Sequence, residues 1–214
     1  MRISFLIVIV FGWPTGMAAQ PLAGFEQYFY ADQSGLQVIV PIVYFQSKRN
    51  WYIESHVNYE QLHTFSTYVG KTFSANKAFS YSITPMLGGV LGALNGGVLG
   101  SNIDLKYKKF AFSSQSQYIF SFENRNADFL YSWMELGYQV VGSALIGFSV
   151  QHTMLNPASA KLETGLLIRF SVKKWLFPMY CFSPATNNRY LILGVAREFS
   201  FPAKTTNHVP RANP

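Results

Sequence analysis

The side chains Glu54, His56 and Glu60 have acid–base character and fall at even spacing in the segment WYIESHVNYE. Successive side chains of a β-strand alternate between its faces, so in a strand these three and Asn58 project from one face. A histidine between carboxylates can shuttle protons or bind a metal. Along a single strand, however, ligands two and four residues apart are too widely spaced for one ion. We therefore predict neither a metal nor a cofactor.

Other charged side chains fall on the polar faces of further alternating segments. If those faces line a common interior, the charges must pair or be hydrated, because isolated buried charges are costly. They would form either an electrostatic lining with a structural role or a constriction that selects small solutes. The predicted lumen-lining residues are Glu54, His56, Asn58, Glu60, Asp104, Lys106, Glu135, Glu163 and Arg169.

The sequence contains serine and histidine residues that are candidates for the catalytic residues of a membrane-embedded lipid hydrolase. In such an enzyme a Ser and a His on adjoining strands act with a third, orienting residue. Ser55 and His56 are neighbours in a strand and so point to opposite faces, which prevents them from pairing. The sequence has no G-x-S-x-G motif. We keep a lipid hydrolase as the alternative function. The residues considered are Ser55, Ser149, Ser183, His56, His63 and His152.

The segment Gly88 to Asn102, GGVLGALNGGVLGSN, is glycine-rich and contains a short duplication. It has neither the Gly-Lys-Ser/Thr ending of a P-loop nor the G-x-G-x-x-G pattern, which argues against phosphate binding. We predict a flexible surface loop that folds over the mouth of the protein. A third hypothesis, adhesion or docking, depends on this loop.

The strand that would position the acid–base cluster is the whole segment Trp51 to Glu60. One face is mostly apolar and the other mostly polar, and about ten residues tilted by roughly 45° cross a bilayer. The pattern indicates one stave of an outer-membrane β-barrel. Aromatic residues near strand ends are typical of the interfacial girdles of such barrels. The predicted girdle residues are Trp51, Tyr59, Phe79, Tyr107, Phe120 and Phe199.

Similar alternation recurs along the chain and predicts an all-β fold, a closed antiparallel transmembrane β-barrel of about 12 strands. If Gly24 to Asp32 is unpaired, about ten strands remain. Alternate connections are short and most of the others longer, as in barrels whose short turns face the periplasm. The short turns are Lys48–Asn50, Ser74–Lys77, Lys108–Lys109, Val141–Ser143 and Lys173–Lys174, and the longer connections include Val90–Gly100, Phe122–Ala127 and Met154–Ala160.

The aromatic residues near strand ends, rather than the composition, favour lipid over a second protein layer as the partner of the apolar faces, because a soluble β-sandwich can share this composition. Hydrophobic residues make up 49% of the chain, aromatic residues 17% and charged residues 13%. Closure of a barrel in lipid pairs every backbone group and removes the sheet edges. Cys181 is the only cysteine, so no internal disulfide forms, and we expect it to be a small apolar strand residue. The formal charge of +7 is assigned to turn lysines that face water or lipid phosphates.

The N-terminus has the features of a secretory signal: Arg2, the apolar run Ile3–Phe11 and small residues at Gly16–Ala19. We predict a signal peptide over residues 1–19, a barrel over 20–199 and a disordered periplasmic tail over 200–214. The protein is expected in the cell outer membrane. The expected partners are outer-membrane lipid, the barrel-assembly machinery and small solutes, with no nucleic acid among them.

With these strands placed, WYIESHVNYE, SITPMLGGVLG, YSWMELGYQ and LIRFSVKKW together resemble a family of small, porin-like outer-membrane β-barrel proteins of Gram-negative bacteria. The resemblance covers most of the chain after the signal and brings no assigned active site. In size and strand number the chain is also similar to the narrow, twelve-stranded oligosaccharide porins, which have strongly basic lumens. Here the predicted inward residues mix acidic and basic side chains, which argues against transport of acidic sugars. We expect a non-enzymatic barrel, either a narrow channel or a structural element.

Overall fold

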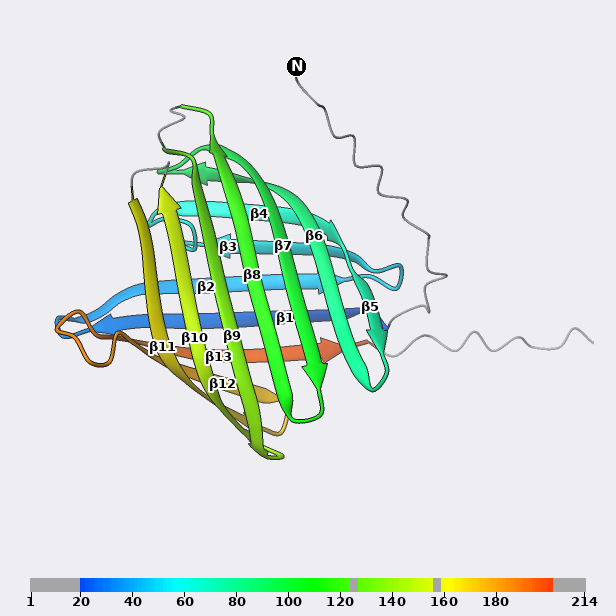
Figure 1. Ribbon diagram of the computed structural model, residues 1–214. Helices are drawn as coiled ribbons and strands as arrows, with labels where there is room; N and C mark the ends of the chain where they lie inside the picture. The colour runs from blue at the N-terminus through cyan, green and yellow to red at the C-terminus, as the bar shows by residue number, and fades with distance from the viewer. Residues whose placement is uncertain (1–19, 124–126, 156–158, 202–214) are drawn as a thin grey trace, which may run out of the picture.

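The computed structural model describes residues 20–123, 127–155 and 159–201, which fold almost entirely as antiparallel strands (Figure 1). No helix in this part of the chain is long and apolar enough to cross a membrane. The signal peptide predicted for residues 1–19 lies outside the described residues, as do residues 202–214 of the predicted tail. Ser200, predicted to begin that tail, instead ends the last strand.

The sheet contains 13 strand segments, each antiparallel to its neighbours. They are β1 (Leu22–Asp32), β2 (Gly35–Gln46), β3 (Trp51–Val57), β4 (Thr64–Lys71), β5 (Phe73–Asn76), β6 (Phe79–Gly92), β7 (Gly96–Tyr107), β8 (Phe110–Ser121), β9 (Phe129–Val141), β10 (Ala144–Leu155), β11 (Ser159–Val172), β12 (Trp175–Phe182) and β13 (Tyr190–Ser200).

The sheet closes on itself. β4 and β5 are two pieces of one stave, since both pair with β6 and only Thr72 separates them. β4 pairs with β3 as well as β6, so the fold is a closed barrel of 12 staves, which confirms the prediction. The ten-strand alternative is wrong, because β1 pairs with β13 on one side and β2 on the other.

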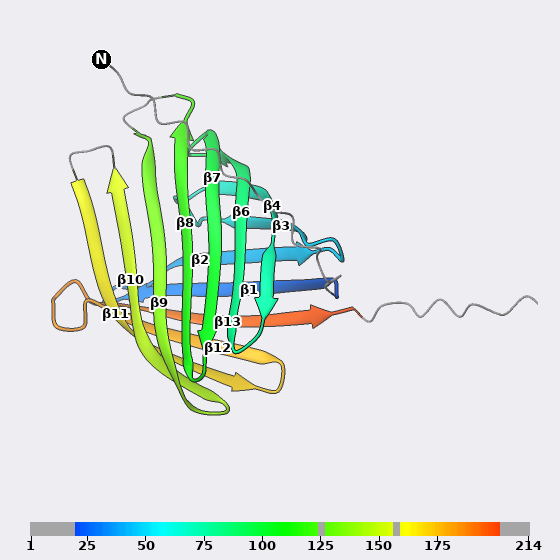
Figure 2. The ribbon, with the colours of Figure 1, turned by 45° about the vertical axis from the view of Figure 1, so that its right-hand side comes forward.

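The strands are steeply tilted. In Figure 1, β6 to β11 cross the front of the barrel while β1 to β4, β12 and β13 form its back, and the two sets run at a large angle to each other. The same crossing is visible after the turn shown in Figure 2. Strands that share one tilt on opposite walls of a barrel cross in this way.

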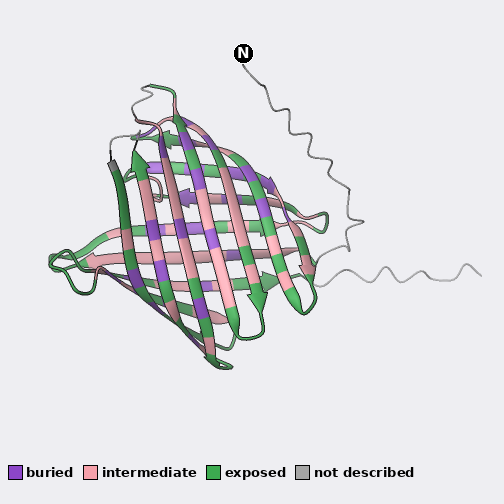
Figure 3. Ribbon diagram, in the orientation of Figure 1, coloured by how far each residue is buried: buried purple, intermediate pink, exposed green. Residues whose placement is uncertain are grey.

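The outer face of the barrel is apolar and exposed. In β3, Trp51 is 54% exposed and Ile53 47%, whereas Glu54 is 3% exposed and His56 2%. Figure 3 shows the resulting alternation along many strands. An exterior of exposed Leu, Ile, Val and Phe side chains is what hydrocarbon accommodates and water does not. The alternation therefore places the apolar side chains on the outside of the barrel, as predicted.

The predicted aromatic girdle is confirmed at Trp51, Phe79, Tyr107, Phe120 and Phe199, whose side chains are exposed near strand ends. It is wrong at Tyr59. β3 ends at Val57, and Asn58 adopts a positive φ of 58° that turns the chain out of the strand.

The short turns occur where predicted except at Ser74–Lys77, where Ser74–Asn76 pair with β6 as part of β5 and the chain turns only at Lys77 and Ala78. These turns share one end of the barrel with the start of β1 and the end of β13. The middle residues of the longer connections predicted at Phe122–Ala127 and Met154–Ala160 lie outside the described residues. The loop predicted at Gly88 to Asn102 is wrong. β6 continues to Gly92, Ala93–Asn95 make a short turn, and β7 begins at Gly96.

The glycines of this segment reflect close backbone approach. A Cβ at Gly88 would clash with the carbonyl oxygen of Thr67, and one at Gly96 with that of Phe120. Gly92 has a φ of 122°, which L side chains rarely adopt. The docking hypothesis that depended on a flexible loop here loses its basis.

Candidate functional site

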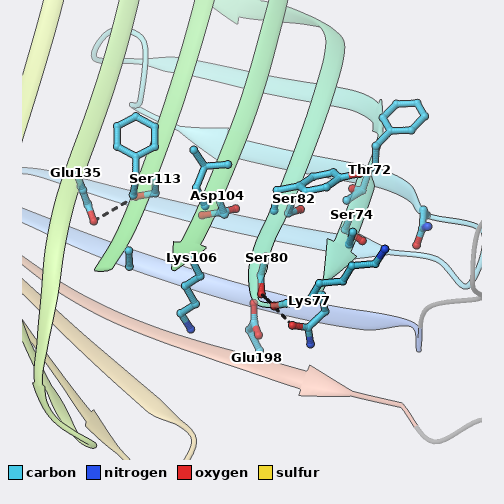
Figure 4. A pocket seen from close by; sticks show the side chains of 18 of the residues that line it. Thr72, Ser74, Lys77, Ser80, Ser82, Asp104, Lys106, Ser113, Glu135 and Glu198 are labelled. Carbon is cyan, nitrogen blue, oxygen red and sulfur yellow. Dashed lines mark hydrogen bonds between the residues drawn. The ribbon is translucent and has the colours of Figure 1, made fainter. Parts of the chain in front are cut away.

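The interior is hollow at the end that carries the short turns. A cavity of about 1660 Å³ opens there, and its lining includes Asp104, Lys106, Glu135 and Arg169 of the predicted lumen set. Figure 4 shows Asp104, Glu135 and a series of hydroxyl side chains from neighbouring strands around this space. Ser113 donates a hydrogen bond to Glu135 at 3.4 Å, and the Arg169 guanidinium forms an ion pair with the same carboxylate. The vestibule is therefore polar, with charges of both signs.

Deeper in the barrel a second cavity of about 380 Å³ is rich in carboxylates. Its lining adds Glu26 and Glu54 to the Asp104, Glu135, Arg169 and Glu198 that also line the vestibule. Phenol groups donate hydrogen bonds to most of these carboxylates. The donors and acceptors are Tyr28 to Glu26 (2.6 Å), Tyr52 to Glu54 (2.5 Å), Tyr44 to Glu198 (2.9 Å) and Tyr180 to Glu135 (2.6 Å).

Sequence analysis missed Glu26, Glu198 and the tyrosines. Two of these pairs carried a local signal, because Glu26 and Tyr28, like Tyr52 and Glu54, are two residues apart and so share a strand face. The pair Tyr44 and Glu198 has no such signal. The two residues lie 154 positions apart and meet through pairing around the barrel wall.

Nearer the loop end, the acid–base cluster is assembled as a buried network. His56 Nε2 lies 2.8 Å from Glu54 Oε1, and its Nδ1 lies 3.6 Å from Glu60 Oε1. The Glu60 carboxylate also accepts hydrogen bonds from the hydroxyls of Ser66 and Tyr68. Within the described part of the chain, no group of three His, Cys, Asp or Glu side chains is arranged to hold a metal ion.

Glu60 belongs to the β3–β4 loop, Asn58–His63, and its side chain is 0% exposed. Burial alone would raise its pKa, but the interactions with His56 and the hydrogen bonds from Tyr68 and Ser66 outweigh burial and hold the pKa below the usual glutamate value of 4.5. The structure therefore favours the ionised carboxylate. A charge–hydrogen-bond contact of this kind fixes the loop inside the barrel.

The same loop places Tyr59 inside the barrel. Its ring lies 4.4 Å from that of His56 and 5.7 Å, edge-on, from that of Tyr131. Its hydroxyl donates to Gln115 Oε1 at 2.7 Å. Gln115 is on β8 and Tyr131 on β9, so the loop reaches from β3 across the interior to staves beyond its neighbours.

Two clusters of buried side chains fill part of the interior. One buried cluster contains Tyr68, Val90, Leu94, Val98, Ile119 and Phe129, and another contains Trp133, Leu145, Leu167, Tyr180, Phe182 and Ile192. Tyr131 packs against both. The cavity around His56, Tyr59 and Tyr131 measures only about 10 Å³. The interior thus narrows from an open vestibule to a tight constriction.

The remaining lumen candidates lie apart from this constriction. Glu163 of β11 pairs with Lys161 at 3.0 Å near the loop end. The side chain of Asn58 holds the β3–β4 turn: its Oδ1 accepts from the backbone N–H of His63 at 2.9 Å, and its Nδ2 donates to the Ile39 carbonyl at 3.2 Å.

The serine and histidine residues considered for a hydrolase are dispersed. Ser55 donates to Thr67, and Ser149 accepts from Trp133 Nε1 at 2.7 Å. His152 is the cross-strand neighbour of Ser132, but that hydroxyl donates to Ser116 at 2.9 Å. No hydrogen bond joins Ser55, Ser132, Ser149 or Ser183 to His56, His63 or His152 in the described ranges. Cys181 is a free, partly buried cysteine in β12.

Comparison with solved structures agrees with this geometry. No protein-family model matches the sequence, and no curated protein matches it either. The KdgM porin matches with a TM-score of 0.57 at 12% identity, covering 84% of this chain and 99% of that one. The KdgM porin in complex with disordered oligogalacturonate gives 0.55 at 12% identity, covering 85% and 99%.

The NanC porin gives a TM-score of 0.51 at 7% identity, covering 85% of this chain and 100% of that one. At such low identity the likeness is one of fold. The protein has the fold of the outer-membrane porins, and its closed barrel with an apolar exterior fits a location in the cell outer membrane.

Proposed function

We propose that this protein is a narrow outer-membrane channel for small solutes whose interior is closed at rest by the β3–β4 loop. The observation that carries the proposal is the shape of the interior, a polar vestibule of about 1660 Å³ followed by a deeper cavity of about 380 Å³ that reaches Tyr59, whose ring contacts Tyr131. A barrel with a purely structural role has no need of such a vestibule, since side chains alone can fill a small barrel. The inserted loop is the part that has to move for a solute to pass.

The lining of the deeper cavity favours neutral or cationic solutes. The deeper cavity presents Glu26, Glu54, Asp104, Glu135 and Glu198 with the Arg169 guanidinium as its cation. A polyanion such as the oligogalacturonate bound by the KdgM porin would meet like charge here, and like charges close together repel strongly in a narrow interior. Tyrosine, serine and carboxylate groups are suited to hydrogen-bond the hydroxyls of a small neutral sugar.

The proposal describes a channel without enzymatic activity. The serines are engaged by groups other than histidine, and an acyl-transfer mechanism needs a serine within hydrogen-bond reach of its base. Insertion into outer-membrane lipid by the barrel-assembly machinery is part of the same proposal, since a closed barrel exposes an apolar exterior that water does not solvate.

Liposome swelling tests the proposed function. Vesicles containing the refolded protein are diluted into isotonic solutions of a neutral sugar, a cationic amino sugar or an acidic sugar, with protein-free vesicles as the control. We expect faster swelling with the neutral and cationic solutes than with the acidic one. Swelling no faster than in protein-free vesicles, together with release of fatty acid from the vesicle lipid, would instead support the hydrolase.

A further inference from the structure

The basic residues of the barrel gather at the end that carries the short turns. Among the described residues, most Lys and Arg side chains belong to these turns or to the adjoining strand ends. They are Lys48, Arg49, Lys71, Lys77, Lys106, Lys108, Lys109, Lys173, Lys174 and Arg197. We call this set the basic rim. Acidic side chains prevail at the opposite end, where Asp32, Glu60, Glu123, Asp128 and Glu163 lie.

Cations of the basic rim lie over aromatic rings at the same end of the barrel. Lys71 Nζ is 5.2 Å from the ring centre of Trp51, and Lys108 Nζ is 5.3 Å from that of Tyr107. Lys109 Nζ is 5.7 Å from the ring of Tyr138. Trp and Tyr on a membrane face sit at the level of the lipid headgroups. The paired cations are therefore at headgroup level too.

Arg197 contacts two aromatic rings, whereas each of these three lysines contacts one. It lies on the lipid-facing side of β13, between its cross-strand neighbours Phe25 of β1 and Trp175 of β12. Its guanidinium carbon is 4.9 Å from the ring centre of Trp175 and 4.8 Å from that of Phe199. The Phe25 and Trp175 rings meet edge to face at 5.8 Å. Two aromatic rings thus hold the guanidinium in place, and the Phe25 ring packs against both of them.

Among the described residues, the guanidinium has no ion-pair partner, and its contacts are with aromatic rings. Its buried Nε also has no hydrogen-bond partner in that part of the chain. Because Trp175 is the first residue of β12, Arg197 is level with the Lys173–Lys174 turn at the rim. A lipid-facing Arg costs far less near the interface than at the bilayer midplane. A planar guanidinium matches a phosphate in charge and geometry.

We propose that Arg197, with the adjacent Lys173 and Lys174, binds the phosphate of an anionic phospholipid in the inner leaflet. The assignment to that leaflet follows from the short turns, which face the periplasm in such barrels. Charge complementarity selects an anionic lipid, and the three aromatic rings offer an apolar surface to its acyl chains. The site is on the outer surface of the barrel and does not depend on solute passage.

Quenching of tryptophan fluorescence by brominated lipid tests the site in the folded, membrane-inserted protein. In a Trp51→Phe background the lipid-exposed tryptophan of the described barrel is Trp175, since Trp133 is buried inside. Quenching by dibrominated phosphatidylglycerol relative to dibrominated phosphatidylcholine gives the lipid preference, and this ratio cancels any direct effect of a substitution on Trp175 emission. The gel shift between unheated and heated samples verifies folding of each variant.

We expect the protein to prefer phosphatidylglycerol, with Arg197→Gln weakening the preference roughly fivefold and Lys173→Gln with Lys174→Gln weakening it further. Arg189→Gln, which removes one positive charge at the opposite end, is the matched control and should leave the ratio unchanged. An equal quenching ratio for the two lipids in the unmodified protein would overturn the proposal. So would an Arg197→Gln ratio equal to that of the parent, or an equal loss in Arg189→Gln.

Discussion

Truncating Tyr59 should open the constriction. The Tyr59→Ala change removes the ring contacts with His56 and Tyr131 and the hydrogen bond to Gln115. Aromatic contacts contribute about 0.5–1.5 kcal/mol each and a hydrogen bond a similar amount, so the inserted loop loses about 3 kcal/mol of stabilisation. That corresponds to an increase of roughly a hundredfold in the ratio of open to closed channels.

Single-channel recording in planar bilayers measures this ratio directly as the open probability. Tyr59→Phe keeps the ring and loses only the hydroxyl, so it should raise the ratio by about fivefold, the effect of roughly 1 kcal/mol. Phe122→Ala is the control, because Phe122 is an aromatic side chain that is 76% exposed just beyond the end of β8. If folded Tyr59→Ala opens no more often than the unmodified protein, the loop is not what closes the barrel.

The remaining predictions concern pH, selectivity and folding. The contacts of Glu60 lower its pKa, so the ionised carboxylate stabilises the loop above pH 4.5 and this stabilisation is lost as the pH falls below 4.5. The open probability should therefore rise in acid. Glu60→Gln should abolish this pH response, and a pH response that persists in the variant would contradict the role given to Glu60. Glu135→Gln leaves the Arg169 charge without its ion-pair partner. The reversal potential in a KCl gradient should therefore shift in the direction of anion selectivity. An unchanged reversal potential would contradict this prediction. Gly147→Ala sets a Cβ against the Leu136 carbonyl and should destabilise the barrel by about 1–3 kcal/mol in denaturant titrations. Gly142→Ala, where the Cβ meets nothing within 4 Å, should be nearly neutral, and equal effects at the two sites would contradict the packing argument.

Local alternation was sufficient to predict the staves. Side chains at alternate positions of a strand point to opposite faces, so the position in the strand decides the environment of each side chain. In β3, Trp51 and Ile53 are exposed, whereas Glu54 and His56 are buried. The turns were equally local, since Lys108 and Lys173, which both adopt positive φ, sit in two-residue reversals between clearly alternating segments.

Features that depend on barrel closure were not predictable from the chain. The inward path of Tyr59 depends on Asn58 adopting positive φ and on partners contributed by β8 and β9. The high glycine content of Gly88 to Asn102 led us to predict a flexible loop. In the barrel, glycines of this segment instead allow the backbones of adjacent strands to approach each other closely. The carboxylate pairs formed by Tyr44 and Tyr180 join residues far apart in sequence. Each of these outcomes is decided by which strands become neighbours in space.

The most direct test of a channel closed by its own loop is to shorten that loop. Replacing residues 59–63 with Asn-Gly keeps the backbone hydrogen bond from Asn58 N to the Thr64 carbonyl, 2.9 Å long, and supplies a tight hairpin turn. In planar bilayers we predict frequent, long openings from the shortened protein and rare openings from the unmodified one. Silence from a shortened barrel that is verifiably folded would show that the interior is closed without the loop, and would contradict the account.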